Sequence, residues 1–439
     1  MKTFLFIFWL CFQSFSCRAD WELPAQDISS TGQVAYNPQI AMDDLGNAVV
    51  VWRRSDGSHY IVQTRRYSAE TSTWSSVQNL SVVGQHTFDP QVAMDGLGNA
   101  IVVWRRTDGR NYIVQTRRYN TETSTWSAVQ TLSVAGQISY DPQISMDTLG
   151  NAITIWRRYD GSHYIVQARR YNVETDTWAS VQDLSDVGEH TFDPQVALAM
   201  NELGNAVAVW RRTDGRNYIV QTRIYNAETN TWSSVQDLSV SGQIAYDPQV
   251  AIDELGNAVA VWRRYNGSHY IVQTRRYSVE NSTWSSVQNL SVVGQDSYGP
   301  QVAVDFLGNA VAVWHRYDVN NYRVKARRYD VQADTWSSLQ DLSASGQVTY
   351  DPQVAMDALG NATVVWRRSD GSHYIVQTSR YNAETSTWST VQDLSVAGNN
   401  TFHPQVAMDT LGDAVVVWRR SDGRNYIVQA SRYDAEVGA

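Results

Sequence analysis

The sequence predicts an all-β protein, an eight-bladed β-propeller built from four-stranded antiparallel blades. Three features of its 439 residues lead to this fold. One unit is repeated eight times, each unit divides into four short β-rich stretches, and a stray copy of the fourth stretch precedes the first unit. Four-stranded units repeated roughly four to eight times are typical of propellers. No window shows a sustained helical period.

The repeat has a period of 52 residues, except for a fourth copy of 54 residues whose ALAMNELGN segment is two residues longer. Its copies begin at Gly32, Gly84, Gly136, Gly188, Gly242, Gly294, Gly346 and Gly398.

Each copy holds four stretches rich in β-branched and aromatic residues, separated by turn residues. In the second copy they read PQVAMD, AIVVWRR, YIVQTRRY and TWSAVQTLS, within residues 90–133. The second stretch is continuously apolar, so we expect it to be buried on both faces. The D-x-L-G-N segment that precedes it has the composition of a tight turn.

The tryptophans favour a closed ring over an open solenoid, the alternative for a repeat of this kind. Every copy has a tryptophan in its second stretch, and the first seven copies have another in the fourth. The eighth copy ends at Ala439 before its fourth stretch, while Trp21 begins WELPAQDIS, which is similar to WSSVQDLS. We therefore expect residues 20–31 to complete the last blade, so that residues 20–439 form one closed domain.

The first 19 residues have the pattern of a secretory signal peptide. Lys2 is followed by the apolar run FLFIFWLCF and by small residues suited to cleavage after Ala19. A lipid anchor on Cys17 is the weaker alternative, because Ser14 stands where a lipoprotein signal usually has leucine. No other stretch resembles a transmembrane helix. We expect a secreted, periplasmic or cell-surface protein.

Charge and cysteine content narrow the function classes. The only cysteines, Cys11 and Cys17, lie in the leader, so the mature chain would have no disulfide. Loss of Lys2 and Arg18 would take the formal charge from −9 to −11, which argues against general nucleic-acid binding. All other basic residues except Lys325 are arginine, which pairs with carboxylates and stacks on aromatic rings.

Two segments of the repeat resemble known propeller families. YNAETNTWSSVQDLS (225–239) resembles the kelch repeat, and PQVAMDGLGNAIVVW (90–104) is similar to the blade signature of NHL-type repeats. The resemblance covers residues 20–439 and implies a bacterial-type secreted β-propeller. It implies no particular activity, because propellers include enzymes, lectins and scaffolds.

A finer pattern alternates between copies. Odd copies read G-S-H-Y between the second and third stretches, and even copies read G-R-N-Y, with copy six the exception. This alternation indicates duplication of a two-blade unit and favours an even number of blades. Copy six also has His315 in place of arginine, together with Val319, Arg323 and Lys325.

An antiparallel meander places its connections on two faces. One face, called the loop face below, carries the 2–3 loops (between second and third strands) and the 4–1 loops (between blades). The opposite face, called the turn face, carries the 1–2 and 3–4 turns. The loop face holds the alternating charged and aromatic residues, so we expect ligand contact there. The candidate ligand-binding residues are Asp56, His59, Asp108, Arg110, Asp160, His163, Asp214, Arg216, His269, Asp370, His373, Asp422 and Arg424.

The histidines do not have the spacing of a metal site. Four lie in the 2–3 loops of alternate copies, while His86 and His190 lie in 4–1 loops. Ligands of one metal ion must converge within a few ångströms. We expect instead that one imidazole per blade fills a similar gap, and we expect no metal and no cofactor.

The paired arginines, such as Arg53–Arg54 and Arg65–Arg66, allow two interpretations. They form a ladder between blades, stacked on tryptophan or paired with carboxylates of the Asp56 and Asp89 type. Alternatively, they form a ring that holds an anionic ligand such as a sialylated or sulfated glycan. Recurrence in nearly every copy favours the ladder. Aspartates of the Asp43 type are expected to form turns rather than bind calcium.

The sequence predicts a binding module rather than an enzyme, because the copies are too alike to gather different catalytic residues in one place. We expect a monomer that presents its loop face to a protein or glycan. One alternative is a multivalent lectin with equivalent sites between blades near the 2–3 loops. Another is a glycoside-processing enzyme at the centre of the ring, with copy six as the specialised blade.

Overall fold

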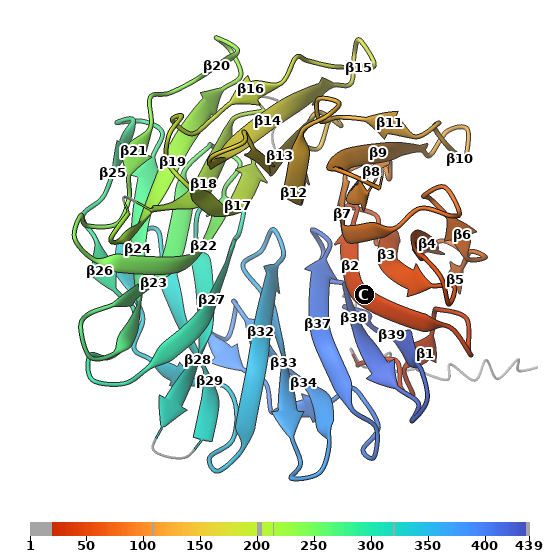
Figure 1. Ribbon diagram of the computed structural model, residues 1–439. Helices are drawn as coiled ribbons and strands as arrows, with labels where there is room; N and C mark the ends of the chain where they lie inside the picture. The colour runs from red at the N-terminus through yellow and green to blue at the C-terminus, as the bar shows by residue number, and fades with distance from the viewer. Residues whose placement is uncertain (1–19, 108, 200–203, 214, 319–320, 436–439) are drawn as a thin grey trace, which may run out of the picture.

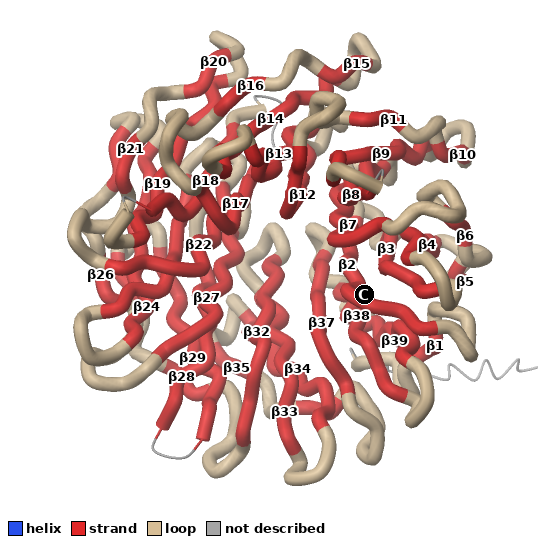
Figure 2. Tube along the Cα trace, viewed as in Figure 1, coloured by secondary structure: helices blue, strands red, loops and turns tan. Residues whose placement is uncertain are grey.

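The computed structural model describes residues 20–107, 109–199, 204–213, 215–318 and 321–435. Eight twisted sheets stand around a central axis, and the two ends of the chain meet in one sheet (Figure 1). Every regular element of the described residues is a β-strand (Figure 2). The eight-bladed, four-stranded propeller predicted from the repeat is confirmed. Blades are numbered 1 to 8 in chain order.

The first strand of each blade lies innermost, beside the first strands of its two neighbours. These strands are β2 (Val34–Met42), β7 (Thr87–Met94), β12 (Ile138–Met146), β17 (Thr191–Leu198), β22 (Ile244–Ile252), β27 (Ser297–Val304), β32 (Val348–Met356) and β37 (Thr401–Met408). Because β2 lies beside β37, the ring is closed.

The second and third strands form the middle of each blade. The second strands are β3 (Ala48–Ser55), β8 (Ala100–Thr107), β13 (Ala152–Tyr159), β18 (Ala206–Thr213), β23 (Ala258–Tyr265), β28 (Ala310–Asp318), β33 (Ala362–Ser369) and β38 (Ala414–Ser421). The third strands are β4 (Tyr60–Ser68), β9 (Tyr112–Asn120), β14 (Tyr164–Asn172), β19 (Tyr218–Asn226), β24 (Tyr270–Ser278), β29 (Asn321–Asp330), β34 (Tyr374–Asn382) and β39 (Tyr426–Tyr433).

The outermost strand is split into two short pieces, where the sequence predicted one continuous strand. In blades 1 to 7 the pieces are β5 (Thr73–Trp74) and β6 (Gln78–Asn79), β10 (Thr125–Trp126) and β11 (Gln130–Thr131), β15 (Thr177–Trp178) and β16 (Gln182–Asp183), β20 (Thr231–Trp232) and β21 (Gln236–Asp237), β25 (Thr283–Trp284) and β26 (Gln288–Asn289), β30 (Thr335–Trp336) and β31 (Gln340–Asp341), and β35 (Thr387–Trp388) and β36 (Gln392–Asp393).

Side-chain hydrogen bonds of Arg65 and Ser75 lie at the split in blade 1. Arg65 Nε donates to the carbonyl of Ser75 at 2.6 Å, so this carbonyl has a side-chain partner. The Ser75 hydroxyl in turn accepts the backbone N–H of Arg66 at 3.0 Å. Side-chain bonds thus replace part of the strand ladder at this point.

The N-terminal segment completes blade 8, as the tryptophan count predicted. β1 (Gln26–Asp27) pairs antiparallel with β39, and Trp21 bridges Tyr433. The Ser29 hydroxyl accepts the backbone N–H of Val428 at 2.8 Å. Trp21 is buried, and its ring lies 5.4 Å from that of Tyr433. Blade 8 is therefore assembled from both ends of the chain.

The hydrophobic core lies between the blades. The tryptophan of each second strand is fully buried, and Trp52 packs on Val415, Val417 and Val428 of blade 8. The indole of Trp52 donates to the Gln63 side chain at 3.1 Å, which satisfies its buried polar atom. The apolar second strands are thus buried on both faces, as expected.

A β-bulge interrupts every first strand, which begins three or four residues earlier than predicted. In blade 1 the register shifts between Tyr36 and Gln39, and Asn37 adopts a left-handed conformation with φ of 49°. The equivalent residue of every other blade also has a positive φ; these residues are Asp89, Asp141, Asp193, Asp247, Gly299, Asp351 and His403. A bulge re-aims a side chain within its strand, and here it does so at the innermost strand.

Candidate functional site

The connections lie on two faces as the meander predicted. On the loop face, His59 of a 2–3 loop lies 5.0 Å from His86 of the following 4–1 loop, measured between ring centroids. On the turn face, Asn47 Oδ1 of a 1–2 turn accepts the backbone N–H of Ala69 in a 3–4 turn at 3.0 Å.

The acidic candidates of the loop face shape their own loops. Asp56 Oδ1 accepts the backbone N–H groups of Ser58 at 2.9 Å and of His59 at 2.7 Å. These two bonds are the main reason that the pKa of Asp56 is lowered. The same pair of bonds is made by Asp160, Asp370 and Asp422.

The remaining candidates are spread around the ring, one loop per blade. Asp108 and Asp214 lie outside the described residues. The structure brings none of the described candidates together from different blades. The exposed or half-exposed basic ones are Arg110, Arg216, Arg424, His59, His163, His269 and His373.

Four of the histidines meet in two pairs, so the expectation of one imidazole per blade is wrong at these two seams. His163 lies 4.9 Å from His190, in the same way as His59 lies beside His86. The reason is geometric, because each 2–3 loop touches the 4–1 loop that leads to the next blade. Within the described residues, no group of three or more His, Cys, Asp or Glu side chains could hold a metal ion.

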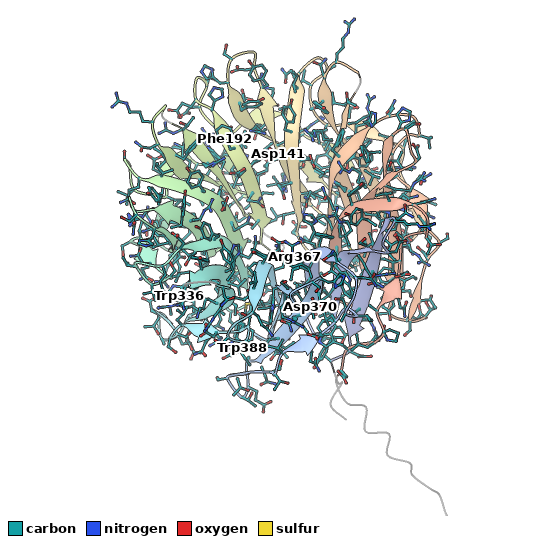
Figure 3. The ribbon with its side chains drawn as sticks, turned by 60° about the horizontal axis from the view of Figure 1, so that its bottom comes forward. Asp141, Phe192, Trp336, Arg367, Asp370 and Trp388 are labelled. Carbon is teal, nitrogen blue, oxygen red and sulfur yellow. The ribbon has the colours of Figure 1, made fainter. Side chains whose placement is uncertain are left out.

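The arginines of the second strands form the ladder that recurrence favoured. Arg105 pairs with Asp89 at 2.9 Å and lies over Tyr112, with its guanidinium carbon 4.6 Å from the ring centroid. The expected stacking on tryptophan is wrong, because the buried tryptophans face the seams between blades and the guanidinium groups contact tyrosine or phenylalanine. Arg367 lies near the centre of the ring, while Trp336 and Trp388 lie toward its outside (Figure 3).

The turn aspartates have the expected role. Asp43 is buried, and its carboxylate accepts the backbone N–H groups of Leu45 at 3.0 Å and Asn47 at 2.8 Å. The Asn47 side chain also donates to it at 2.8 Å. The carboxylate therefore organises the 1–2 turn.

Copy six brings Arg323 and Lys325 together on Asp341, but His315 is not part of this group. His315 lies among Tyr298 and Tyr322, where burial lowers its pKa to about 4. Lys325 is buried elsewhere, in contact with Asp341. Val319 lies outside the described residues.

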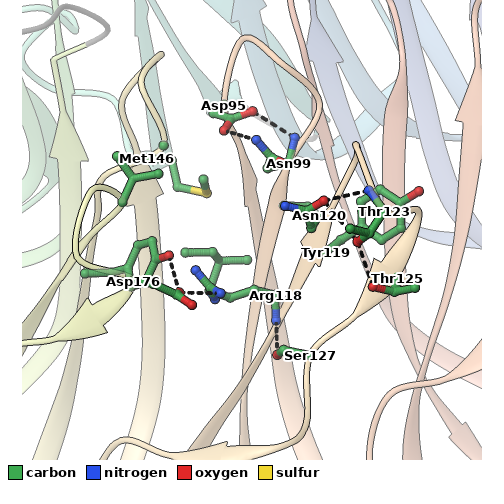
Figure 4. Close-up of a pocket in the computed structure, with 15 residues that line it drawn as sticks. Asp95, Asn99, Arg118, Tyr119, Asn120, Thr123, Thr125, Ser127, Met146 and Asp176 are labelled. Carbon is green, nitrogen blue, oxygen red and sulfur yellow. Dashed lines mark hydrogen bonds and ion pairs between the residues drawn. The ribbon is translucent and has the colours of Figure 1, made fainter.

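A pocket of about 360 Å³ lies between blades 2 and 3 on the turn face (Figure 4). Its apolar wall includes Ile101, Tyr119 and Tyr171. Its polar rim includes Arg118 from blade 2 and Asp176 from blade 3, which contact each other across the seam. This pocket lies between blades, at the face opposite the 2–3 loops near which the alternative of a multivalent lectin places its sites.

The same pocket is built a second time between blades 5 and 6, with a volume of about 370 Å³. All of its lining residues occupy positions that also line the first pocket; they are Asp253, Asn257, Ala258, Val259, Arg276, Tyr277, Ser278, Thr283, Ser285, Val304, Gly308, Tyr329, Val331 and Asp334. Both volumes lie at the lower end of the range for small-molecule sites, about 300–1,000 Å³.

The two pockets share an arginine, tyrosine and aspartate arrangement. Arg118 lies over the Tyr171 ring at 4.5 Å, and the Tyr171 hydroxyl donates to Asp176 at 2.8 Å. In the second pocket, the Tyr329 hydroxyl donates to Asp334 at 2.7 Å. The Asp176 and Asp334 side chains remain 66% and 71% exposed, so these carboxylates keep acceptor capacity toward the solvent.

The seam between blades 1 and 2 lacks this acid. Ser124 stands at the position of Asp176, and the cavity there measures about 200 Å³. Arg66 lies 3.8 Å over the Tyr119 ring, and among the described residues the buried Tyr119 hydroxyl has no hydrogen-bond partner. The sequence does distinguish the pockets that carry this acid. In copies 1 to 7, the residue two positions before the fourth-strand tryptophan varies among Ser, Asp and Asn.

A smaller cavity of about 110 Å³ lies on the axis at the turn face. Its lining comes from blades on opposite sides of the ring and includes Met42, Asp44, Ile252 and Met356. Burial, and then the neighbouring Asp43 and Asp95, raise the pKa of Asp44.

Solved structures similar to this chain have low sequence identity to it. The Dos1 propeller matches with a TM-score of 0.54 and 9% identity over 93% of each chain. An ulvan lyase of family PL25 matches at 0.53 and 9% identity, over 91% of this chain and 93% of that one. The polysaccharide lyase Uly1 matches at 0.50 and 10% identity, over 77% and 88%.

These likenesses show the fold alone, because the identities are so low. No protein-family model matches the chain. No curated protein matches it either. Membership of the kelch or NHL type stays a prediction. Among the described residues, no helix has the length and apolar character needed to cross a bilayer.

Proposed function

We propose that this protein is an exported, multivalent carbohydrate-binding module whose sites are the inter-blade pockets of the turn face. One observation carries the proposal: the pocket with an Arg–Asp rim and tyrosine wall is built twice, from equivalent residues three blades apart. Repeated sites of modest size suit a ligand that itself repeats, because weak sites gain avidity together.

The chemistry of the rim suits sugar hydroxyl groups. Asp176 accepts hydrogen bonds, and Arg118 donates them from a planar fork, so the pair can engage neighbouring hydroxyls of one ring. Thr123 and Thr125 add hydroxyl groups on the same edge of the pocket. The adjacent apolar wall offers a surface for the C–H face of a sugar.

The test is binding to an array of neutral and acidic oligosaccharides, by the wild-type chain and by the double variant Asp176→Asn, Asp334→Asn. We expect saturable binding by the wild type and a loss of about tenfold or more in the double variant, because each change removes a charged hydrogen-bond acceptor. A hit that binds the double variant equally well would contradict the assignment of the sites.

A matched control addresses the loop face. His373→Asn changes a half-exposed candidate residue on that face and leaves both pockets intact. We expect no change in binding. If His373→Asn weakens binding while the double variant does not, the loop face is the binding face.

A further inference from the structure

Sixteen aromatic residues form a belt around the inner strands near the loop face. Each blade contributes one ring from its first strand and one from the start of its third strand. Neighbouring ring centroids lie 5.1–6.4 Å apart where they are in contact. The rings are Tyr36, Tyr60, Phe88, Tyr112, Tyr140, Tyr164, Phe192, Tyr218, Tyr246, Tyr270, Tyr298, Tyr322, Tyr350, Tyr374, Phe402 and Tyr426.

An arginine from the second strand sits on this belt in seven blades. In five of them it pairs with the aspartate of the first-strand bulge. The pairs are Arg105–Asp89 at 2.9 Å, Arg157–Asp141 at 2.9 Å, Arg211–Asp193 at 3.1 Å, Arg263–Asp247 at 3.1 Å and Arg367–Asp351 at 3.1 Å. The five carboxylates are 33–43% exposed, so the bulge position faces solvent.

A bulge aspartate can act on two arginines, one of its own blade and one of the preceding blade. Asp89 interacts electrostatically with Arg105 of its own blade and with Arg53 of the preceding blade. Asp193 likewise interacts with Arg211 and Arg157. An arginine of this ring therefore has two possible partners, the bulge of its own blade and that of the next.

Arg419 of blade 8 has neither of these two carboxylate partners. Its own bulge residue is the exposed His403, and the bulge of blade 1 is Asn37. Among the described residues, Arg419 forms no ion pair, while it lies over Phe402 at 4.5 Å and Tyr426 at 4.3 Å. Burial is the main cause that lowers the pKa of Arg419; Tyr426 and Tyr36 raise it, and the positive charges of Arg367 and Arg53 lower it.

In blade 6 the loss of the bulge aspartate is accompanied by the loss of the arginine that would face it. There the bulge residue is Gly299, and His315 replaces the arginine, so cation and anion are lost together. A Cβ on Gly299 would lie 3.3 Å from the His315 ring. Blade 8 instead keeps the cation and loses the anion.

We propose that Arg419, flanked by His403 and Asn37, binds the carboxylate of a uronic acid sugar. A carboxylate is the group that the equivalent arginines hold in five other blades, and the Arg fork takes it bidentately. The neutral amide of Asn37 and the imidazole of His403 can bind hydroxyl groups beside that carboxylate. This inference does not depend on the inter-blade pockets, and it predicts one site per chain.

The test is calorimetric titration with D-glucuronate at low ionic strength, in a buffer without carboxylates, with D-glucose as the uncharged control. We expect one saturable site per chain for glucuronate and none for glucose at this position. Arg419→Gln should weaken glucuronate binding at least tenfold. His403→Asp places a carboxylate where five other blades already have one, so the variant should fold and should also lose binding at least tenfold.

Arg105→Gln, at an arginine whose aspartate is already present, is the matched control and should leave glucuronate binding unchanged. Absence of saturable glucuronate binding, or binding that His403→Asp leaves intact, would overturn the proposal. Binding of a glutamate-rich peptide in place of glucuronate would overturn the assignment to a sugar.

Discussion

Blades 2 and 8 are built on the same strands and differ in what their charged groups face. In blade 2, Arg105 has Asp89, and the turn carboxylate Asp95 has the amide of Asn99 at 2.8 Å. In blade 8, Arg419 faces His403, and the turn carboxylate Asp409 faces a second acid, Asp413.

Comparing the two blades separates features that stabilise the fold from features that do not. A feature shared by nearly all blades, such as the buried tryptophan or the turn carboxylate, holds the ring together. In blade 8, by contrast, Arg419 and Asp409 lack the partners that their equivalents Arg105 and Asp95 have in blade 2. Blade 8 is also the blade that both ends of the chain must assemble. Changes in this blade should therefore affect stability and binding most.

The largest effect is expected from removal of the closing strand. Deleting residues 20–30 would expose the edge of β39 and remove buried Trp21 and Ile28. Losing a buried tryptophan alone typically destabilises by about 3–5 kcal/mol. We expect a lower melting temperature or edge-to-edge association, measured by calorimetry and by light scattering.

Transplantation provides the control for that deletion. Moving residues 20–30 to the end of the chain would let β39 run directly into its outer strand, as the third strands of the other blades do. This variant should recover most of the lost stability. An unchanged melting temperature and monomeric state after simple deletion would contradict closure by this strand.

A second change would make blade 3 resemble blade 8. In the double variant Asp141→His, Asp193→Asn, Arg157 would lose the carboxylates of its own bulge and of the next. Arg105 keeps Asp89, and Arg211 keeps the Asp247 of the next blade. If an unmatched arginine is what binds glucuronate, calorimetry should count two sites per chain where the wild type has one. A count that stays at one would show that the unmatched arginine is insufficient.

A smaller effect, with a defined pH dependence, is expected at the turn of blade 8. Burial, and then the charge of Asp413, raise the pKa of Asp409 to about 6. The folded state therefore holds this proton more tightly than the unfolded chain, so the ionised pair destabilises the fold increasingly as pH rises from about 4 to above 6. Asp413→Asn restores the asparagine found in the other blades. It should stabilise by about 1–2 kcal/mol at pH 7 and by little at pH 4, because burial of Asp409 remains.

The reverse substitution in blade 7 is the matched control for this prediction. Asn361 donates to Asp357 at 2.7 Å, and Asn361→Asp would create a second acidic pair. We expect a loss of stability at pH 7 that shrinks toward pH 4, measured by chemical denaturation at both values. Equal changes at both pH values would show that the effect is not electrostatic.

Substitutions in the two inter-blade pockets should have the smallest effects on stability. They should nevertheless change the number of oligosaccharide-binding sites. Asp176→Asn alone should remove one of two matched sites and leave the other unchanged, because Asp334 lies three blades away. Titration of an oligosaccharide identified on the array would show a halved number of sites at unchanged affinity. A uniform drop in affinity would argue against independent pockets.

Much of the fold could be predicted from the sequence because the repeat is nearly exact. The period set the blades, the apolar second strand gave the buried layer, and the displaced tryptophan at position 21 gave the closure. The bulge of the first strand was not predicted, because a residue before proline usually has an extended backbone, whereas Asp89 has a positive φ.

The inter-blade pockets and the Arg419 site were harder to predict, because they depend on contacts between residues far apart in the sequence. The pocket joins Arg118 and Asp176, which lie on different blades, and the sequence alone does not say that they meet. The departure at His403 is visible when copies are compared at the residue before the first-strand proline. Only the structure shows that this residue faces an arginine, because the bulge directs it there.

The most direct measurement is the number of oligosaccharide sites per chain, counted by calorimetric titration with a neutral oligosaccharide selected on the array. A neutral probe makes no use of the carboxylate site proposed at Arg419. Two or more equivalent sites per chain, lost together in the double variant Asp176→Asn, Asp334→Asn, are the predicted result. No binding on the array, or a single site that survives the double variant, would contradict a multivalent carbohydrate-binding module.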